Sequence, residues 1–173
     1  VGAGLIGQFT SQAALACGAI VTVCDLNADR LRVAAELGAH HTVVPDADWA
    51  NIKALGPFDC VFEDSGAPVL DGIVGRTWNQ GILKLRGRLV MIAGRGRVDY
   101  NFNAAQGGEI EVQHASHFVL DDLRETCRLY LEGRIQIAPL LRDVVHFRDM
   151  PALYDRLRDA PDSLLGVVFD WRE

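Results

Sequence analysis

Apolar and polar positions in the first part of the chain follow two alternating periods. The alanine-rich run 5–17 has helical spacing, and the β-branched run 20–25 that follows it has the composition of a strand. Asn27 is a typical N-cap for the next helical run, because its side chain can accept from the first free N–H groups. Gly18 and Gly38 each stand just past a predicted helix end, where glycine is favoured. The pattern predicts two helices around one strand in this region.

The same alternation of helix and strand continues through the middle of the chain. It predicts strands at 40–44, 58–62 and 87–94, helices at 46–55 and 70–85, and two short strands at 100–103 and 110–113. Strands that alternate with helices form parallel sheets covered by helices on both faces. We therefore expect an α/β fold with a Rossmann-type, doubly wound parallel sheet.

Beyond about His114 the regular alternation stops. The pattern predicts a helix at 120–132, an extended segment interrupted by Pro139, a strand at 143–147, a helix at 150–159 and a strand at 164–171. We expect residues 1–113 to form a nucleotide-binding domain, and 114–173 to form an α+β tail that packs on something else.

The glycine-rich start of the chain carries the most specific chemical signal. Residues 2–7 read G-x-G-x-x-G, and they stand at the opening of the first predicted helix. Gly2 permits a tight turn, Gly4 lets the backbone approach a pyrophosphate, and Gly7 lets the helix lie close to the sheet. The N–H groups near Leu5 and Ile6 then face the phosphates at the positive end of the helix dipole. The motif predicts a dinucleotide site.

Asp25 ends the strand that follows this helix, eighteen residues after Gly7. A carboxylate at this place accepts hydrogen bonds from the hydroxyls of an adenosine ribose, and it would repel a 2′-phosphate. We therefore expect NAD rather than NADP as the cofactor.

Composition narrows the class of protein. The chain has 173 residues, 49% of them hydrophobic, and a formal net charge of −6. The acidic balance and the lack of long basic runs argue against nucleic acid or an anionic membrane surface as partners. No apolar run reaches the length of a membrane span, and no signal peptide precedes the glycine motif, so we expect a cytoplasmic protein.

The cysteines and histidines give no specific metal signal. Cys17, Cys24, Cys60 and Cys127 are scattered without zinc-site spacing, and we interpret all four as reduced residues of the core or surface. His114 and His117 form an H-x-x-H pair, but two histidines without a third ligand are better explained as structural residues. We expect no metal site in these 173 residues.

Several longer stretches resemble the medium-chain, zinc-type alcohol and polyol dehydrogenases. The resemblance covers essentially the whole chain, and it is carried by the residues GAGLIG (2–7), CGA (17–19), DLNADRL (25–31), ELGA (36–39), FD (58–59), EDSG (63–66), GRLVMIAG (87–94) and APL (138–140). In that family the last segment returns to complete a catalytic domain begun by an N-terminal portion. The chain starts at Val1, in the strand that should carry the glycine turn, so we expect that portion, with the zinc ligands and proton relay, upstream.

The resemblance implies roles for further residues. It places Leu26 and Arg30 near the adenosine ribose, Ser65 and Gly66 near the riboses, and Ala93, Gly94 and Arg95 near the nicotinamide carboxamide. For Arg30 an exposed helix charge is an equally good interpretation, and for Arg95 a surface charge is the better one. Many members carry a basic residue at or beside the position of Gly166, where it contacts the pyrophosphate. Gly166 puts that contact in doubt.

By resemblance, the expected reaction is reversible hydride transfer between a small-molecule alcohol or polyol and nicotinamide, with zinc in the full-length parent. We expect these 173 residues to be inactive alone. Two alternatives are a non-catalytic NAD-sensing regulatory module and a zinc-independent quinone reductase. The pattern at 87–94 and the tail disfavour the first, and Asp25 disfavours the second.

Assembly can be predicted from the sheet order 3-2-1-4-5-6 that is expected for this fold. The short strand predicted at 100–103 lies near one end of that order, and an edge strand exposes unpaired backbone groups. We expect a homodimer or homotetramer in which two copies of this edge pair.

Overall fold

The computed structural model describes residues 1–173. Its helices are α1 (Leu5–Ala16), α2 (Ala28–Glu36), α3 (Ala50–Lys53), α4 (Leu70–Val74), α5 (Phe102–Gly107), α6 (Leu120–Leu131) and α7 (Met150–Asp159), with short 3-10 turns η1 (Ala138–Leu140), η2 (Phe147–Asp149) and η3 (Pro161–Ser163). Its strands are β1 (Thr22–Cys24), β2 (His41–Val43), β3 (Phe58–Glu63), β4 (Leu83–Met91), β5 (Glu111–His114), β6 (Leu141–His146) and β7 (Gly166–Asp170).

All of the strand pairs are parallel: β1 with β2, β3 with β4 and β5, and β6 with β7. Val1 and Gly2 connect the β1–β2 pair to the β3–β4–β5 sheet. Val1 donates from its amino group to Phe62 O at 2.6 Å and accepts from Asp64 N at 2.8 Å, while Gly2 N donates to Cys24 O at 2.8 Å. The spatial order is therefore β2, β1, the Val1–Gly2 segment, β3, β4 and β5. This confirms the expected order 3-2-1-4-5-6 and the Rossmann-type fold.

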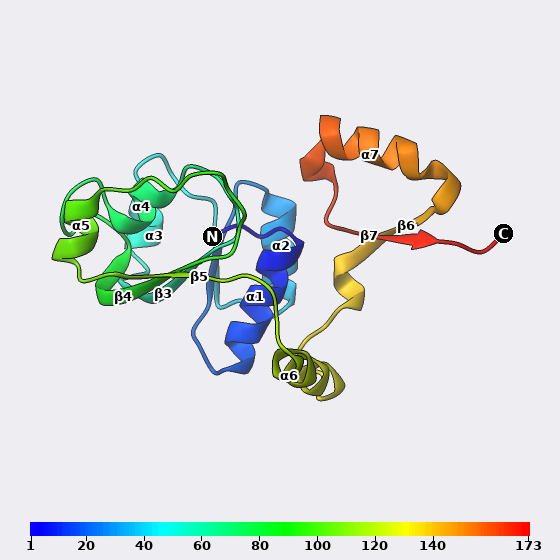
Figure 1. The fold of residues 1–173 in the computed structure, drawn as a ribbon, viewed down its shortest axis with the longest axis horizontal. Helices are drawn as coiled ribbons and strands as arrows, with labels where there is room; N and C mark the ends of the chain where they lie inside the picture. The colour runs from blue at the N-terminus through cyan, green and yellow to red at the C-terminus, as the bar shows by residue number, and fades with distance from the viewer.

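Two apolar clusters hold residues 1–113 together. In Figure 1, α3, α4 and α5 lie beside the β3–β4–β5 sheet, and α1 and α2 lie near the centre of the molecule. The larger cluster packs those outer helices on the sheet through Ile73 and Leu89, both fully buried. The smaller one joins β1 to α2 through Val23 and Leu31.

The tail is a separate β6–α7–β7 unit that is joined to the rest by polar and apolar contacts. Gln12 on α1 is 2% exposed, and it exchanges two hydrogen bonds with the backbone of Gln136, at 2.7 and 3.2 Å. Leu140 of η1 is buried in a cluster with Val33 of α2 and Leu37, which follows that helix. α1 and α2 thus contact both the sheet and the tail.

Local stop and start signals in the sequence are confirmed. The Asn27 side chain accepts from Asp29 N and Arg30 N, which caps α2 as expected. Gly18 and Gly38 take positive φ angles of +82° and +100° directly after α1 and α2. These angles are strained for residues with a Cβ, so glycine fixes both helix ends.

The strand predicted at 100–103 is wrong. Asn101 instead caps a helix, because its side chain accepts from Ala104 N at 2.9 Å, and α5 begins at Phe102. The edge of the sheet is β5, which confirms the strand predicted at 110–113. The alternating polarity of 100–103 favours a strand, but the hydrogen bond that the Asn101 side chain makes as a helix cap favours a helix, and the helix forms.

The long helix predicted over 70–85 is also wrong. α4 ends at Val74, Gly75 follows with φ +99°, and β4 already begins at Leu83. Gly81 returns so close to α4 that a Cβ there would lie 2.4 Å from Ile73 O. The apolar residues after Gly81 therefore belong to β4 and not to a continuation of α4.

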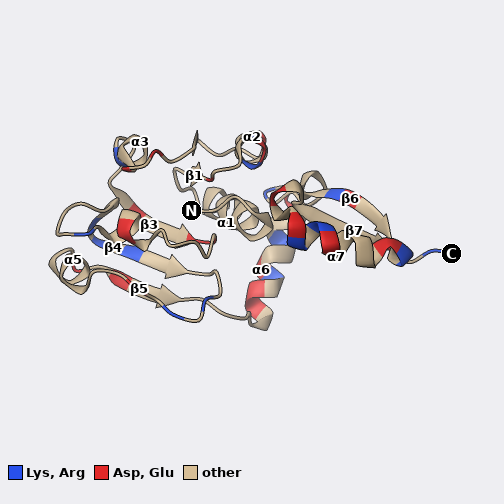
Figure 2. Cartoon of the chain, turned by 90° about the horizontal axis from the view of Figure 1, so that it is seen from above, with Lys and Arg blue, Asp and Glu red and all other residues tan.

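Charged residues of both signs are interspersed over α6 and α7 (Figure 2). On α6, Arg128 forms ion pairs with Glu125 at 2.5 Å and with Glu132 at 2.6 Å. None of the helices combines the length and the apolar character that crossing a membrane requires.

All four cysteines are free, and they differ in burial. Cys24 is buried in β1 and Cys60 is half-buried in β3, and burial raises the pKa of both thiols. Because the thiolate is the reactive form, iodoacetamide at pH 7.5 is expected to label the exposed Cys17 and Cys127 well before Cys24. Peptide mass mapping over time measures this order. Faster labelling of Cys24 than of Cys17 in the folded chain would contradict it, and unfolding should equalise all four.

Candidate functional site

The glycine turn between Val1 and α1 is built as the motif predicts. Gly2 has φ +95°, and a Cβ on it would lie 2.9 Å from Ser65 N in the loop after β3. A Cβ on Gly7 would lie only 2.0 Å from Gly2 O, so only glycine lets the helix pack on the turn. At Gly4, by contrast, no atom lies within 4 Å of the position that a Cβ would take. Two of the glycines thus close the turn, and the third leaves an open space above it.

The start of α1 offers free N–H groups to that space. The first intrahelical hydrogen bond runs from Gln8 N to Gly4 O at 2.9 Å, and no side chain caps the helix. The N–H groups of Leu5, Ile6 and Gly7 precede that bond and have no intrahelical partner. They lie at the positive end of the helix dipole, where a phosphate is stabilised.

Asp25 lies beside this turn at the carboxyl end of β1. One carboxylate oxygen accepts from Ala3 N at 2.6 Å and the other from Asn27 N at 2.8 Å, so the side chain is fixed in place. A carboxylate has about four acceptor positions, and two remain for hydroxyl donors. Leu26 follows Asp25 and is 81% exposed.

Two loops lie on the opposite side of the glycine turn from Asp25. Ser65 and Gly66 follow β3, and Ala93 and Gly94 follow β4. The loops touch, since a Cβ on Gly66 would lie 3.6 Å from the Ala93 Cβ. The structure thus brings the predicted residues of these loops, the glycine turn and Asp25 to one end of the parallel strands, at the carboxyl ends of β1, β3 and β4.

Arg95 is not the surface charge that its position in the sequence favours. Its side chain is 13% exposed and forms an ion pair with Glu63, which is fully buried at the end of β3. Sequence reasoning noted Glu63 only within the EDSG stretch and gave it no role. The signal in the sequence that could have identified Glu63 is its position at the end of an apolar strand. A carboxylate buried there requires a charged or hydrogen-bonding partner.

Arg30 lies on α2 with its guanidinium directed at the tail. It donates to Pro161 O at 3.2 Å and to Leu164 O at 3.1 Å, and it forms an ion pair with Asp162 at 3.5 Å. The interpretation of Arg30 as an exposed helix charge is therefore wrong, since its side chain is only 19% exposed. Arg30 therefore connects α2 to the tail.

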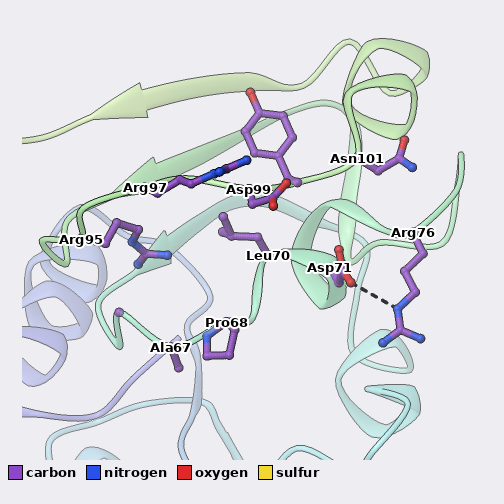
Figure 3. Close-up of a pocket in the computed structure, with 11 residues that line it drawn as sticks. Ala67, Pro68, Leu70, Asp71, Arg76, Arg95, Arg97, Asp99 and Asn101 are labelled. Atoms are coloured by element: carbon purple, nitrogen blue, oxygen red, sulfur yellow. Dashed lines mark hydrogen bonds and ion pairs between the residues drawn. The ribbon is translucent and has the colours of Figure 1, made fainter.

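A pocket of about 690 Å³ lies next to the loops after β3 and β4. Figure 3 shows Ala67 and Pro68 at one end and the segment from Arg95 to Asn101 along one wall. Arg76 at the far side is paired with Asp71 at 3.3 Å. The pocket mixes charges of both signs and shares Gly66 and Arg95 with the two loops.

Comparison with known proteins decides the family. The sequence pattern described as zinc-binding dehydrogenase matches residues 6–132, which is more than half of the chain. The chain belongs to the zinc-binding dehydrogenase family. This confirms the resemblance to the medium-chain, zinc-type alcohol and polyol dehydrogenases.

Curated relatives of this dehydrogenase chain are about twice its length. Sorbitol dehydrogenase 1 of Saccharomyces cerevisiae is 30% identical over 169 residues, which cover 89% of the chain and 45% of that protein. The 2-dehydro-3-deoxy-L-galactonate 5-dehydrogenase of Pseudoalteromonas atlantica is 28% identical, over 97% of the chain and 49% of that protein. The chain thus spans about half the length of the curated relatives it matches.

Solved structures share the fold. L-idonate 5-dehydrogenase from Escherichia coli matches with a TM-score of 0.77 and 25% identity, over 97% of the chain and 47% of that structure. The 2R,3R-butanediol dehydrogenase from Bacillus subtilis matches with a TM-score of 0.81 and 22% identity, over 99% and 49%. The whole chain, including the tail, therefore has the fold of about half of each of these dehydrogenase structures.

The structure explains the glycine at position 166. Gly166 is buried at the start of β7, and a Cβ on it would lie 2.4 Å from the backbone oxygen of Leu140. Any longer side chain would have to displace that backbone. Packing against the Leu140 backbone therefore requires glycine at this position.

No group of three or more His, Cys, Asp or Glu side chains in the chain could hold a metal ion. His114 ends β5, and His117 follows in the next loop with φ +62°. The residues of this chain therefore do not fit a zinc site.

Proposed function

We propose that the chain binds NAD(H) and places the nicotinamide for hydride transfer in an alcohol or polyol dehydrogenase. The observation that carries the proposal is the pairing of two features on one sheet edge. Free N–H groups at the start of α1 suit a pyrophosphate, and the fixed carboxylate of Asp25 suits ribose hydroxyls. The open space at Gly4 would admit the pyrophosphate, because no Cβ fills it.

Each half of the cofactor then has its own residues. The adenosine half would lie on Asp25, Leu26 and Arg30, with Arg30 also holding the tail through its guanidinium. The other half would lie beyond the glycine turn, on Ser65, Gly66, Ala93, Gly94 and Arg95. We assign residues 1–113 to the nucleotide-binding domain and 114–173 to the returning part of the catalytic domain.

The chemistry assigned to the whole protein extends beyond this chain. When bound, NAD supplies the hydride acceptor, and the residues above hold and orient it. The names of the relatives, which act on sorbitol, sugar acids and alcohols, support a small-molecule alcohol or polyol as substrate. We propose that the zinc ligands belong to another part of the protein, that the whole protein is cytoplasmic, and that this chain alone does not oxidise alcohols.

The test is a fluorescence titration of the chain with NADH and NADPH. We expect saturable binding of NADH and binding of NADPH at least tenfold weaker, because the phosphate would meet Asp25. Equal affinities, or tighter binding of NADPH, would rule out the role of Asp25. If NADH does not bind, the proposal fails as a whole.

We also propose that the whole protein is a homodimer or homotetramer that pairs through β5, the true edge strand. Ala115 N donates inward to Met91 O at 3.1 Å, so the N–H of His114 points outward by the two-residue alternation of a strand. Proline at His114 removes that donor in both copies. Each lost hydrogen bond is worth about 1 kcal/mol, so dimer affinity should fall roughly thirtyfold.

Light scattering across a dilution series of the whole protein measures this effect. His114→Ala is the matched control, because it removes the same side chain and keeps the N–H. Unchanged association of His114→Pro, or a wild-type monomer at micromolar concentration, would exclude the pairing. Phe102, in the edge strand expected from the sequence, is unsuitable for this test, since it is the first residue of α5 and tolerates proline.

A further inference from the structure

Glu63 fixes the loop that follows β3. Its side chain is fully buried, and one carboxylate oxygen accepts from Ser65 N at 2.9 Å, from Gly66 N at 3.0 Å and from the Ser65 hydroxyl. Three donors on one oxygen hold the loop in a single conformation. The loop cannot shift without breaking bonds to a buried charge, which is costly.

The same residue also fixes the loop that follows β4. The second carboxylate oxygen of Glu63 forms the ion pair with Arg95, and Arg95 donates from Nε to Ala93 O at 3.4 Å. The backbone oxygen of Glu63 accepts from both Ile92 N and Ala93 N at 3.1 Å. One residue therefore anchors both loops, by its side chain and by its backbone.

These loops lie on one side of the glycine turn only. A Cβ on Gly2 would lie within 3.1 Å of the Ser65 backbone, whereas Asp25 bonds to Ala3 on the other side of the turn. A dinucleotide lies across this point with one nucleotide on each side. If Asp25 holds the adenosine ribose, the nicotinamide nucleotide lies over the loops that Glu63 and Arg95 join.

We propose that Glu63 and Arg95 form a positioning pair for the nicotinamide half of the cofactor; this rests on the proposed function. Neither residue needs to touch the cofactor through its side chain. The pair holds the backbone of 65–66 and 93–94 in the arrangement that receives the ring, so the loops need not be ordered when the cofactor binds. Such preorganisation appears as affinity for the part of the ligand that the loops contact.

The test compares two ligands on the same variants. NADH carries both nucleotides, whereas ADP carries the adenosine and both phosphates without the second ribose or the nicotinamide. Arg95→Met removes the charge but keeps much of the side-chain length. We expect it to weaken NADH binding about tenfold, while ADP binding changes less than twofold. Calorimetry measures both affinities, and the fluorescence maximum of bound NADH reports the surroundings of the ring.

Two further variants separate positioning from folding. Arg95→Lys keeps one positive charge and should recover part of the NADH affinity. The double variant Glu63→Gln with Arg95→Met leaves no unpaired buried charge, so it should fold even if Arg95→Met does not. It should show the same selective loss of NADH binding, because the tie between the loops is absent.

Arg88→Met is the matched control. Arg88 lies on β4 and forms an exposed ion pair with Glu111 at 2.8 Å, outside the two loops and the pocket beside them, and its loss should change neither affinity by more than twofold. Equal weakening of NADH and ADP binding in both Arg95→Met and the double variant would overturn the proposal in favour of a role in folding alone. Unchanged NADH affinity would also overturn it. Failure of the wild-type chain to bind either ligand is a different result, which refutes the proposed function itself.

Discussion

Replacing Gly7 with alanine is expected to lower the free energy of unfolding by about 3 kcal/mol, at the upper end of the usual overpacking cost. The new methyl group would lie 2.0 Å from Gly2 O and 2.9 Å from Gly2 C, and these backbone atoms cannot move aside as a flexible side chain could. α1 would have to separate from the glycine turn. Urea denaturation followed by circular dichroism measures the change, and NADH binding should be lost with the turn.

Gly4→Ala is the matched control for this substitution. It adds the same methyl group in the same motif, but no atom lies within 4 Å of it, so stability should change by less than about 1 kcal/mol. Its effect should fall on the cofactor, because the methyl group would occupy the space proposed for the pyrophosphate. A Gly7→Ala variant as stable as wild type would show that the turn and helix are not packed as described.

Asp25→Asn is expected to lower NADH affinity roughly a hundredfold. Hydrogen bonds to a charged group are worth about 1.5–3 kcal/mol, and the amide of asparagine can replace only one of the two acceptor oxygens. NADPH affinity should stay the same or rise, since the repulsion of its 2′-phosphate is removed. Parallel titrations with the two cofactors measure the ratio.

Asp29→Asn controls for the lost charge, because Asp29 lies four residues further along, exposed on α2. It should leave the preference for NADH intact. If Asp25→Asn and Asp29→Asn shift the two affinities equally, the effect is one of overall charge, and Asp25 does not select the cofactor.

The parts of the fold that local chemistry determines could be predicted from the sequence. Asn27 caps α2, Gly18 and Gly38 end helices with positive φ, and α7 spans the predicted residues 150–159. In each case the deciding interaction lies within a few residues of the pattern that predicts it. The sheet order followed from the family of folds that the glycine motif indicates.

The errors came from competition between two local patterns. Residues 100–103 alternate in polarity like a strand, but Asn101 gains a hydrogen bond as a helix cap. The run 70–85 looks like one amphipathic helix, but Gly75 and Gly81 bring the chain back against α4. Which pattern prevails depends on what the folded chain packs against, and the sequence does not display that.

In the candidate site, too, local features could be predicted from the sequence and contacts between distant residues could not. The turn at Gly2–Gly7 and the position of Asp25 beside it could be predicted from the sequence, because the turn, the helix and the strand that ends at Asp25 form one continuous motif. The partners of Arg95 and Arg30 are not, since Glu63 lies on another strand and Pro161 and Leu164 lie far along the chain. Pairing of charges across elements depends on the tertiary fold.

The close packing of Gly166 against Leu140 also limits how the chain can be engineered. A Cβ at position 166 would lie 2.4 Å from the Leu140 backbone oxygen, so no basic side chain can be introduced there while η1 stays in place. Changes in η1, near Pro139, would have to come before the new charge. A library that varies position 166 alone should therefore return only glycine among its stably folded members.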